Sequence, residues 1–162
     1  MVVIRKAELA DIPVIQRIAF KTWPETFGEI LSKPQLTYML DLMYSETSLK
    51  EQINEKGHDF VISGADGFAS FQVNYGDSPV TKIHKIYILP TAQGQGVGKA
   101  LFSHIVAMSK ACGNDRLTLN VNKYNQSAIA FYEKLGFTEV CRENIPIGNG
   151  FWMEDMVMEK SI

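Results

Sequence analysis

The sequence predicts a mixed α+β fold with a largely antiparallel sheet flanked by helices. Apolar residues recur at helical spacing through the first third of the chain, and alternating or β-rich runs follow. Between residues 82 and 122 the order is strand, glycine-rich turn, helix and strand. A chain of 162 residues falls within the size range of one domain, so we expect residues 1–162 to form a single domain.

Composition excludes several classes of protein. The chain has 16 Lys+Arg and 18 Asp+Glu residues, and its charges alternate in sign without forming basic blocks, so we expect no nucleic-acid partner. No run approaches the ~20 apolar residues that cross a bilayer, and the N-terminus lacks the apolar core of a secretory signal. We therefore expect no membrane association and a cytoplasmic location. The two cysteines lack metal-ligand spacing, so no metal site is expected.

Capping residues and apolar spacing predict helices in the first third of the chain. The expected elements are a strand at 2–4 and helices that begin after Asp11, Ser32 and either Ser45 or Ser48, the last ending before Gly57. The second helix has the clearest start, because Ser32 and Gln35 have the spacing of a capping box around Pro34.

Strands and helices alternate in the remaining two thirds. Strands are expected at 60–63, 68–75, 82–89, 117–121, 137–142 and 152–158, and helices from Gly96 to near Gly113 and from Asn125 or Ser127 to Gly136. Residues 64–67 suit the turn of a hairpin. Strict alternation in the strand at 82–89 predicts two sets of side chains, with Ile83, Lys85, Tyr87 and Leu89 on one face and His84, Ile86 and Ile88 on the other.

The glycine-rich turn carries the strongest functional signal. Its residues are Gln93-Gly94-Gln95-Gly96-Val97-Gly98-Lys99, and they open a helix directly after a strand. Glycine lets backbone amides approach a ligand, and a helix N-terminus favours negative charge, so the turn predicts a phosphate or pyrophosphate site. A nucleoside-triphosphate loop does not match, because Gln93 stands where its first glycine belongs and Ala100 replaces its hydroxyl residue. The alternative is a turn without a ligand.

Two motifs in order resemble one known family. Residues 93–98 resemble the Gln/Arg-x-x-Gly-x-Gly/Ala motif of the GCN5-related N-acetyltransferases (GNAT superfamily), and residues 125–137 resemble its second signature, Asn-x-x-Ala-x-x-Phe-Tyr-x-Lys-x-Gly-Phe. The similarity covers most of the chain from about residue 60. Residues 22–26 and 154–160 are similar to the PaiA-like branch of bacterial polyamine acetyltransferases. The resemblance implies a sheet whose parallel strands, at 82–89 and 116–121, splay apart around acetyl-CoA.

The resemblance also assigns roles to residues. Cofactor contacts would come from backbone groups of Ile86, Tyr87 and Ile88, from Gln93, Gly94, Gln95, Gly96, Val97, Gly98 and Lys99, and from Asn125, Tyr132 and Lys134. Tyr132 is the implied general acid, with core packing as its alternative role. A phenol has a higher pKa than a thiol, so hydrogen bonding to the leaving thiolate contributes beside protonation.

His84 is the candidate general base for the attacking amine. It lies in the strand that would bind the cofactor, and an imidazole titrates near neutral pH. Glu139, Glu143 and a bound water are the alternatives.

The implied reaction is direct acetyl transfer from acetyl-CoA to a primary amine. Substrate contacts are expected from the early helices and the connection at 144–151, with Trp23, Glu25, Glu29, Tyr38, Trp152 and Asp155 as candidates. Aromatic rings and carboxylates together suit a polyamine such as spermidine or spermine, while another small amine and a protein N-terminus stay open. A non-catalytic acyl-CoA-binding module is the alternative function. A homodimer is common among such proteins, but no residue here decides it.

Overall fold

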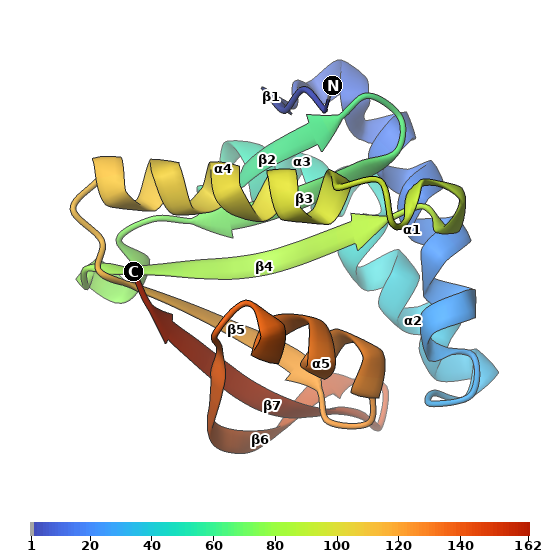
Figure 1. Cartoon of the computed structure of the whole chain (residues 1–162). Coiled ribbons are helices and arrows are strands. Elements are labelled where there is room, and N and C mark those ends of the chain that lie inside the picture. The colour runs from blue at the N-terminus through green and yellow to red at the C-terminus, as the bar shows by residue number, and fades with distance from the viewer. Residues whose placement is uncertain (1) are drawn as a thin grey trace.

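The computed structural model describes residues 2–162, which form an α+β fold with a seven-stranded sheet (Figure 1). The helices are α1 (Ile12–Phe27), α2 (Lys33–Tyr44), α3 (Glu46–Asn54), α4 (Val97–Ala111) and α5 (Gln126–Lys134). The strands are β1 (Arg5–Lys6), β2 (Asp59–Ser63), β3 (Gly67–Gln72), β4 (Val80–Ile88), β5 (Arg116–Asn122), β6 (Thr138–Gly148) and β7 (Phe151–Ser161). Their order is β1-β2-β3-β4-β5-β7-β6, with only β4 and β5 parallel. The predicted fold class is confirmed.

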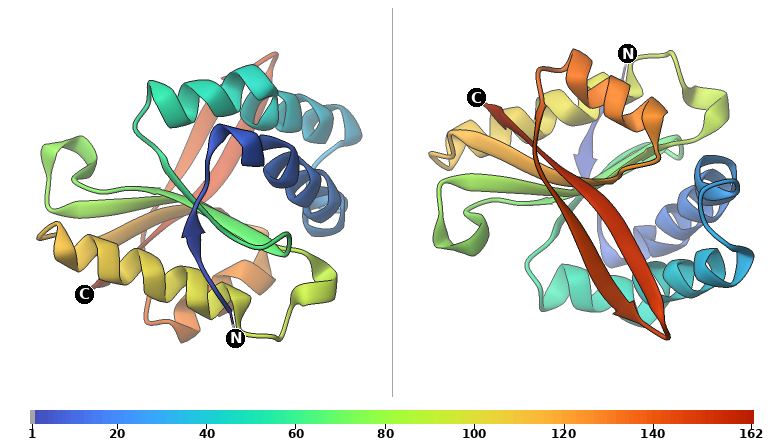
Figure 2. Two further views of the ribbon diagram at one scale, coloured as in Figure 1. Left: turned by 90° about the horizontal axis from the view of Figure 1, so that it is seen from above. Right: turned by 90° about the horizontal axis from the view of Figure 1, so that it is seen from below.

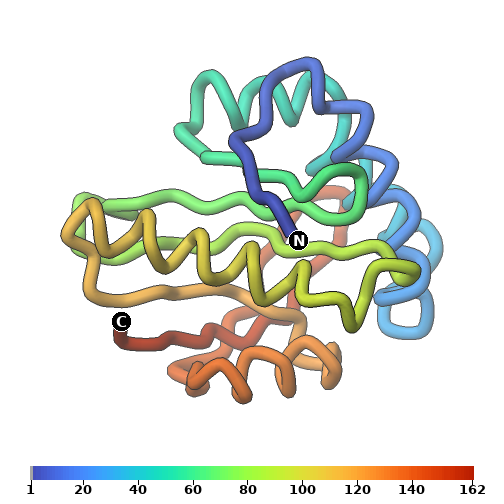
Figure 3. The backbone as a smooth tube through the Cα atoms, turned by 45° about the horizontal axis from the view of Figure 1, so that its top comes forward, coloured from blue at the N-terminus to red at the C-terminus, as the bar shows by residue number. Residues whose placement is uncertain are grey.

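Helices cover both faces of the sheet. Figure 2 shows α1, α2 and α3 on one face and α4 and α5 on the other. Figure 3 traces α4 running back along β4, against which it packs. Each face has its own hydrophobic cluster, centred on Leu101 and Ile105 beneath α4 and on Ile15 and Ile18 beneath α1. The sheet therefore separates two cores, and β4 contributes side chains to both.

The parallel pair separates halfway along β4. Its ladder runs from Val80 opposite Arg116 to Ile83 opposite Leu119 and stops there. The outer neighbours stay paired, because β3 follows β4 as far as Ile88 and β7 follows β5 throughout. In Figure 1 the two strands diverge from this point. Beyond Ile83, the backbone edge of β4 that faces β5 therefore has no strand partner.

A β-bulge in β4 changes which side chains face which core. Ser70 of β3 pairs with Lys85, but the next residue pairs with Ile83, so His84 is an extra residue on β4. The predicted strict alternation is therefore wrong at this point. Ile83 packs with Ile86 and Ile88 in the cluster beneath α4, while Lys85 and Tyr87 face the side of α1–α3.

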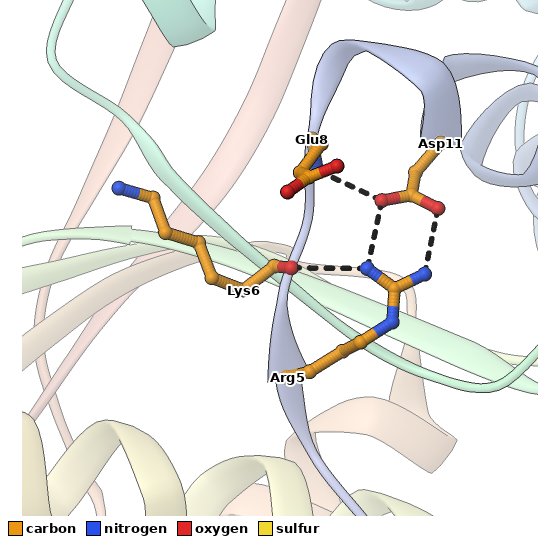
Figure 4. Close-up of polar contacts among 4 residues, drawn as sticks. All are labelled: Arg5, Lys6, Glu8 and Asp11. Atoms are coloured by element: carbon orange, nitrogen blue, oxygen red, sulfur yellow. Dashed lines mark hydrogen bonds and ion pairs between the residues drawn. The ribbon is translucent and has the colours of Figure 1, made fainter.

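The chain start also differs from the prediction. The first strand is Arg5–Lys6, not 2–4, and Val2 and Ile4 instead pack against the cluster beneath α4. Asp11 precedes α1 without capping it through its side chain. Its carboxylate accepts two hydrogen bonds from Arg5, at 2.8 and 3.0 Å, and one from the Glu8 N–H, at 2.7 Å (Figure 4). A bidentate guanidinium is a stronger partner than a free helix amide.

The C-terminal strands are longer than predicted. The sequence predicts a connection at 144–151, but β6 continues to Gly148 and only two residues separate it from β7. The two strands pair from Thr138 opposite Glu159 to Gly148 opposite Phe151, which keeps the connection extended. In the other direction β3 is shorter than predicted, because a turn at Tyr75–Asp77 follows its end at Gln72.

We expect Ser32→Ala to lower the free energy of unfolding by about 1 kcal/mol. Ser32 Oγ accepts a hydrogen bond from the Gln35 N–H at 3.2 Å and so caps α2. The Gln35 side chain reaches Trp152 O instead of returning to Ser32, so this single bond is the cap. Denaturant unfolding measures the loss. Ser32→Gly is the control and should lose only a few tenths of a kcal/mol against wild type; equal losses would contradict a capping role.

Candidate active site

The predicted glycine turn borders a cleft of about 740 Å³ between the end of β4, the loop at 93–99 and α5, which we call the glycine-loop cleft. Gly94 and Gly96 have φ of 79° and 82°, in the left-handed region that favours glycine. A Cβ built on either residue would meet no atom within 4 Å. The loop is therefore shaped by its glycines, and the space beside them is open.

The same loop has unpaired backbone amides, which makes it suitable for binding an anion. Gly96 precedes α4, and no side chain caps this helix. Among residues 2–162, no group accepts a hydrogen bond from the N–H of any residue from Gly94 to Lys99; the first bond at the helix start is Ala100 N to Gly96 O, at 3.0 Å. Free amides at a helix N-terminus bind phosphate. The loop thus fits the pyrophosphate of a coenzyme A-type cofactor.

A second cavity, of about 540 Å³, lies against α1–α3, and we call it the helical-face cavity. Its walls come from α1, α2 and α3 and from strands β4, β5 and β7. The two cavities share the lining residues Ile86, Tyr87, Asn125, Ala128 and Tyr132. A ligand held by the glycine loop and a second ligand under the helices would therefore meet where β4 and β5 separate.

Tyr132 stands at this junction. Its ring packs between Phe131 and Phe137, with centroids 5.3 and 5.5 Å away. Burial raises the pKa of Tyr132 to about 12. The hydroxyl is therefore protonated at neutral pH, which suits a hydrogen-bond donor and not a base.

His84 lines the helical-face cavity and stacks on His58, with ring centroids 3.9 Å apart and planes 9° apart. Its Nε2 lies 3.3 Å from Gln72 Oε1. Burial, with the neighbouring His58 and Lys85 adding to it, lowers the pKa of His84 to about 3. The imidazole is therefore neutral at neutral pH but weakly basic, and its role as the general base stays a prediction.

The two stacked histidines predict a loss of stability in acid. Burial lowers the pKa of His58 to about 4 and that of His84 to about 3, below the value near 6.5 of an unfolded histidine. The unfolded chain therefore takes up protons first, so the contribution of the two histidines to stability is complete above about pH 6.5 and is lost as pH drops through about 4 toward about 3. We expect Tm to decrease across this window. Replacing both histidines by Gln should flatten the profile, and an unchanged slope in that double variant would contradict the assignment.

A polar cluster also lines the helical-face cavity, and one of its members, Glu143, reaches the surface. Lys82 Nζ donates to Asn120 Oδ1 at 2.5 Å, and Asn120 Nδ2 donates to Asp155 at 3.2 Å and to Glu143 at 3.3 Å. Burial raises the pKa of Asp155, while Asn120 and Lys82 oppose that rise. Of the alternative bases, Glu143 contacts this cluster, whereas Glu139 pairs with Arg142 at 2.6 Å on the surface.

Most of the predicted cofactor residues lie together. Ile86, Tyr87, Ile88, Gln93, Gly94, Gly96, Val97, Gly98, Lys99, Asn125 and Tyr132 line the glycine-loop cleft. Gln95 and Lys134 are exposed and line neither cavity. Asn125 has a structural task as well, because its Oδ1 accepts from the Ala128 N–H at 3.2 Å and caps α5.

The predicted substrate residues are divided. Trp23, Trp152 and Asp155 line the helical-face cavity, Glu25 lines the glycine-loop cleft, and Glu29 lines neither. Tyr38 also lines neither, because its hydroxyl donates to Ile147 O at 2.6 Å. Sequence reasoning missed Tyr44, Gln52 and Lys85, which the fold brings to one wall of the helical-face cavity. No local pattern marks them, since their positions depend on the bulge and on helix packing.

A cluster of metal ligands is absent from the described part of the chain. Within residues 2–162, no three His, Cys, Asp or Glu side chains gather as metal ligands would. Over the same residues, no helix is both long and apolar enough to cross a bilayer.

Comparison with known families decides the affiliation. Residues 18–137, more than half of the chain, match the model of the acetyltransferase (GNAT) family. The chain belongs to the acetyltransferase (GNAT) family. This confirms the family resemblance seen in the two motifs.

Two relatives are named for different substrates, and a solved structure shares the fold. A 61-residue segment is 48% identical to the 5-NmdU N-acetyltransferase of Pseudomonas phage PaMx11, covering 38% of this chain and 41% of that enzyme. A 110-residue segment is 24% identical to the L-methionine sulfoximine/L-methionine sulfone acetyltransferase of Salmonella typhimurium, covering 64% of each. The chain thus matches less than two thirds of either relative's length. The crystal structure of PaiA N-acetyltransferase from Thermoplasma acidophilum in complex with coenzyme A has the same fold, with a TM-score of 0.80 and 22% identity over 100% of this chain and 99% of that one.

Proposed function

We propose that this chain is an acetyl-CoA-dependent N-acetyltransferase and that residues 1–162 act as one acetyltransferase domain. The observation that carries the proposal is that the two cavities meet at Ile86, Tyr87 and Tyr132. At its other end the glycine-loop cleft is bordered by the unpaired backbone amides of residues 94–99. Such an arrangement places a donor and an acceptor substrate end to end. The family supports an amine as the acceptor.

The residues divide the work of binding. The amides of Gly94–Lys99 would hold the pyrophosphate, and the free inner edge of β4 at 86–88 would pair with the pantetheine arm as a strand does. When bound, acetyl-CoA supplies a thioester whose acyl carbon the amine attacks. Tyr132 donates a hydrogen bond to the departing sulfur.

The attacking nitrogen must lose a proton. A free primary ammonium has a pKa near 10.4, so it is rarely neutral at pH 7. Two groups that line the helical-face cavity would receive or relay the proton: neutral His84, and Asp155 with the polar cluster around it. We keep His84 as the proposed base and Asp155 as the alternative, because Asp155 also lines the cavity.

The PaiA-like branch and a polyamine acceptor are the finer predictions. The fold likeness to PaiA supports the branch, while the substrates named for other relatives differ. Of the three carboxylates expected to attract a polyamine, only Asp155 lines the helical-face cavity. Polyamine specificity, a cytoplasmic location and a homodimer all stay predictions.

An amine-panel assay tests the proposed function. We expect the purified protein to release CoA from acetyl-CoA with at least one member of a panel of polyamines, free amino acids and peptides, and acetate alone should not form. Binding of acetyl-CoA without CoA release across the panel would favour the non-catalytic alternative. Calorimetry with CoA, run in parallel, separates a lack of cofactor binding from a lack of turnover.

A further inference from the structure

Lys85 is a buried lysine on the wall of the helical-face cavity that has no anionic partner. The residue is 9% exposed. Its ammonium makes one hydrogen bond, to Gln52 Oε1 at 2.6 Å, and lies over the rings of Tyr44 and Phe60, 5.7 and 5.5 Å from their centroids. No carboxylate in residues 2–162 forms an ion pair with it. A buried cation without a counter-charge is costly, so this position favours an incoming anion.

Two neutral donors beside Lys85 have no acceptor other than each other. Tyr44 Oη and Trp23 Nε1 are buried and interact with one another, and neither makes a hydrogen bond with another group in the part of the chain that the structure describes. The two rings meet edge to face with centroids 5.7 Å apart, and both line the helical-face cavity. Buried Trp and Tyr normally find a partner for their polar atom. The Tyr44 hydroxyl and the Lys85 ammonium therefore have more hydrogens to donate than acceptors around them, and the Trp23 N–H lies next to that hydroxyl.

The charges that line the helical-face cavity also favour an anionic ligand. Its lining contains the lysines Lys56, Lys82 and Lys85 but only one carboxylate, that of Asp155. Asp155 belongs to the polar cluster with Lys82 and Asn120, where Asn120 donates to it, and it forms no ion pair with Lys85. An acceptor with several positive charges would face a net positive wall, whereas an acceptor with a negative group would be attracted.

We propose that Lys85, Tyr44 and Trp23 form a carboxylate subsite, and that the acetyl acceptor is a small amine that also bears a carboxylate. This inference rests on the proposed function, because it names the acceptor class of the same site. Lys85 directly precedes Ile86 and Tyr87, where the two cavities meet, so a short zwitterion spans from the subsite to the junction. Side chains of α1 and α2 (Phe27, Met39, Leu42 and Met43), with Leu31 of the connection between these helices, supply an apolar wall, which favours an acceptor whose remaining part is apolar.

Three small molecules that share an isobutyl group test the subsite: leucine, isoamylamine, which lacks the carboxylate, and isocaproate, which lacks the amine. We expect wild type to acetylate leucine with a kcat/KM at least about 10-fold above that of isoamylamine, and to bind isocaproate in calorimetry. In Lys85→Met this preference should fall about 10-fold or more, and isocaproate binding should weaken by a similar factor. The same comparison is repeated for other free amino acids and their decarboxylated amines.

Two more variants separate the loss of a donor from a general disturbance of the fold. Tyr44→Phe keeps the buried ring and removes one donor, so isocaproate binding should weaken by about 3- to 10-fold even if Lys85→Met folds poorly. Lys110→Met makes the same change at an exposed position of α4, outside both cavities. It should alter neither the preference for leucine over isoamylamine nor the binding of isocaproate.

The outcomes separate the two proposals. If isocaproate binding depends on Lys85 but no amine is acetylated, the subsite stands and the proposed function fails. If amines are acetylated but carboxylate-bearing ones are never preferred, and isocaproate does not bind, the function stands and the subsite is overturned. The subsite is also overturned if isocaproate binds equally well to wild type, Lys85→Met and Tyr44→Phe.

Discussion

Tyr132→Phe should lower kcat by about 10- to 100-fold while leaving the Kd for acetyl-CoA nearly unchanged. Burial raises the pKa of Tyr132 to about 12, above the value near 8.5 of a free thiol, so complete proton transfer to the thiolate is uphill by about 5 kcal/mol. The hydroxyl then acts mainly through a hydrogen bond to developing negative charge. Such a bond is worth about 1.5–3 kcal/mol, which sets the expected range.

Steady-state kinetics and calorimetry together check this prediction. The ring of Tyr132 remains in the variant, so its packing against Phe131 and Phe137 is kept. Tyr124→Phe is the matched control, because Tyr124 is 52% exposed and lines neither cavity. An unchanged kcat in Tyr132→Phe would remove this residue from the mechanism and leave it the packing role alone.

Gly96→Val is expected to raise the Kd for CoA by about 10- to 100-fold. At φ 82° a β-branched residue is strained by about 1–3 kcal/mol, and relaxing that strain moves the amides at the start of α4. A side chain there would also project into the open space of the glycine-loop cleft. Calorimetry with CoA measures the loss of affinity, and thermal unfolding measures the strain separately.

Gly64 offers a matched control for that strain. It has φ 52°, lies in the turn between β2 and β3, and a Cβ added there also meets nothing within 4 Å. Gly64→Val should therefore lower stability as Gly96→Val does but leave the Kd for CoA unchanged. If both variants bind CoA as wild type does, the glycine loop is not the pyrophosphate site.

Sequence alone predicted the features that depend on neighbouring residues. The glycine loop, the cap at Ser32 and the helix that follows Asn125 are local patterns, and the structure contains each of them. The family signatures predicted the splayed parallel pair correctly. The loop and the two capped helices are fixed by backbone conformation or by capping within a few residues, so no knowledge of distant contacts was needed for them. The parallel pair joins distant strands, and only the family resemblance predicted it.

The missed features depend on contacts between distant segments. Ile83 lies on the opposite face from Lys85 because β3 and β4 pair with one extra residue at His84, and a run of alternating residues does not reveal that register. The contact of Lys85 with Gln52 of α3 depends on how a distant helix packs on the sheet. Asp11 was predicted correctly as the residue before α1 but not as the partner of Arg5, since a bidentate ion pair outcompetes a helix amide. Glu29 and Tyr38 were predicted near the substrate because of their residue types, but neither lines a cavity. Residue type alone does not indicate which way a side chain points.

The extra residue in β4 has a consequence for the evolution of this site. His84 adds one side chain to the face beneath α1–α3, while Ile83, Ile86 and Ile88 keep their places beneath α4. A homologue that lost this residue would keep the apolar support beneath α4 and would change the side chains that line the helical-face cavity. The shape of that cavity can thus change by the gain or loss of a single residue, as well as by substitution, while the isoleucines beneath α4 stay in place.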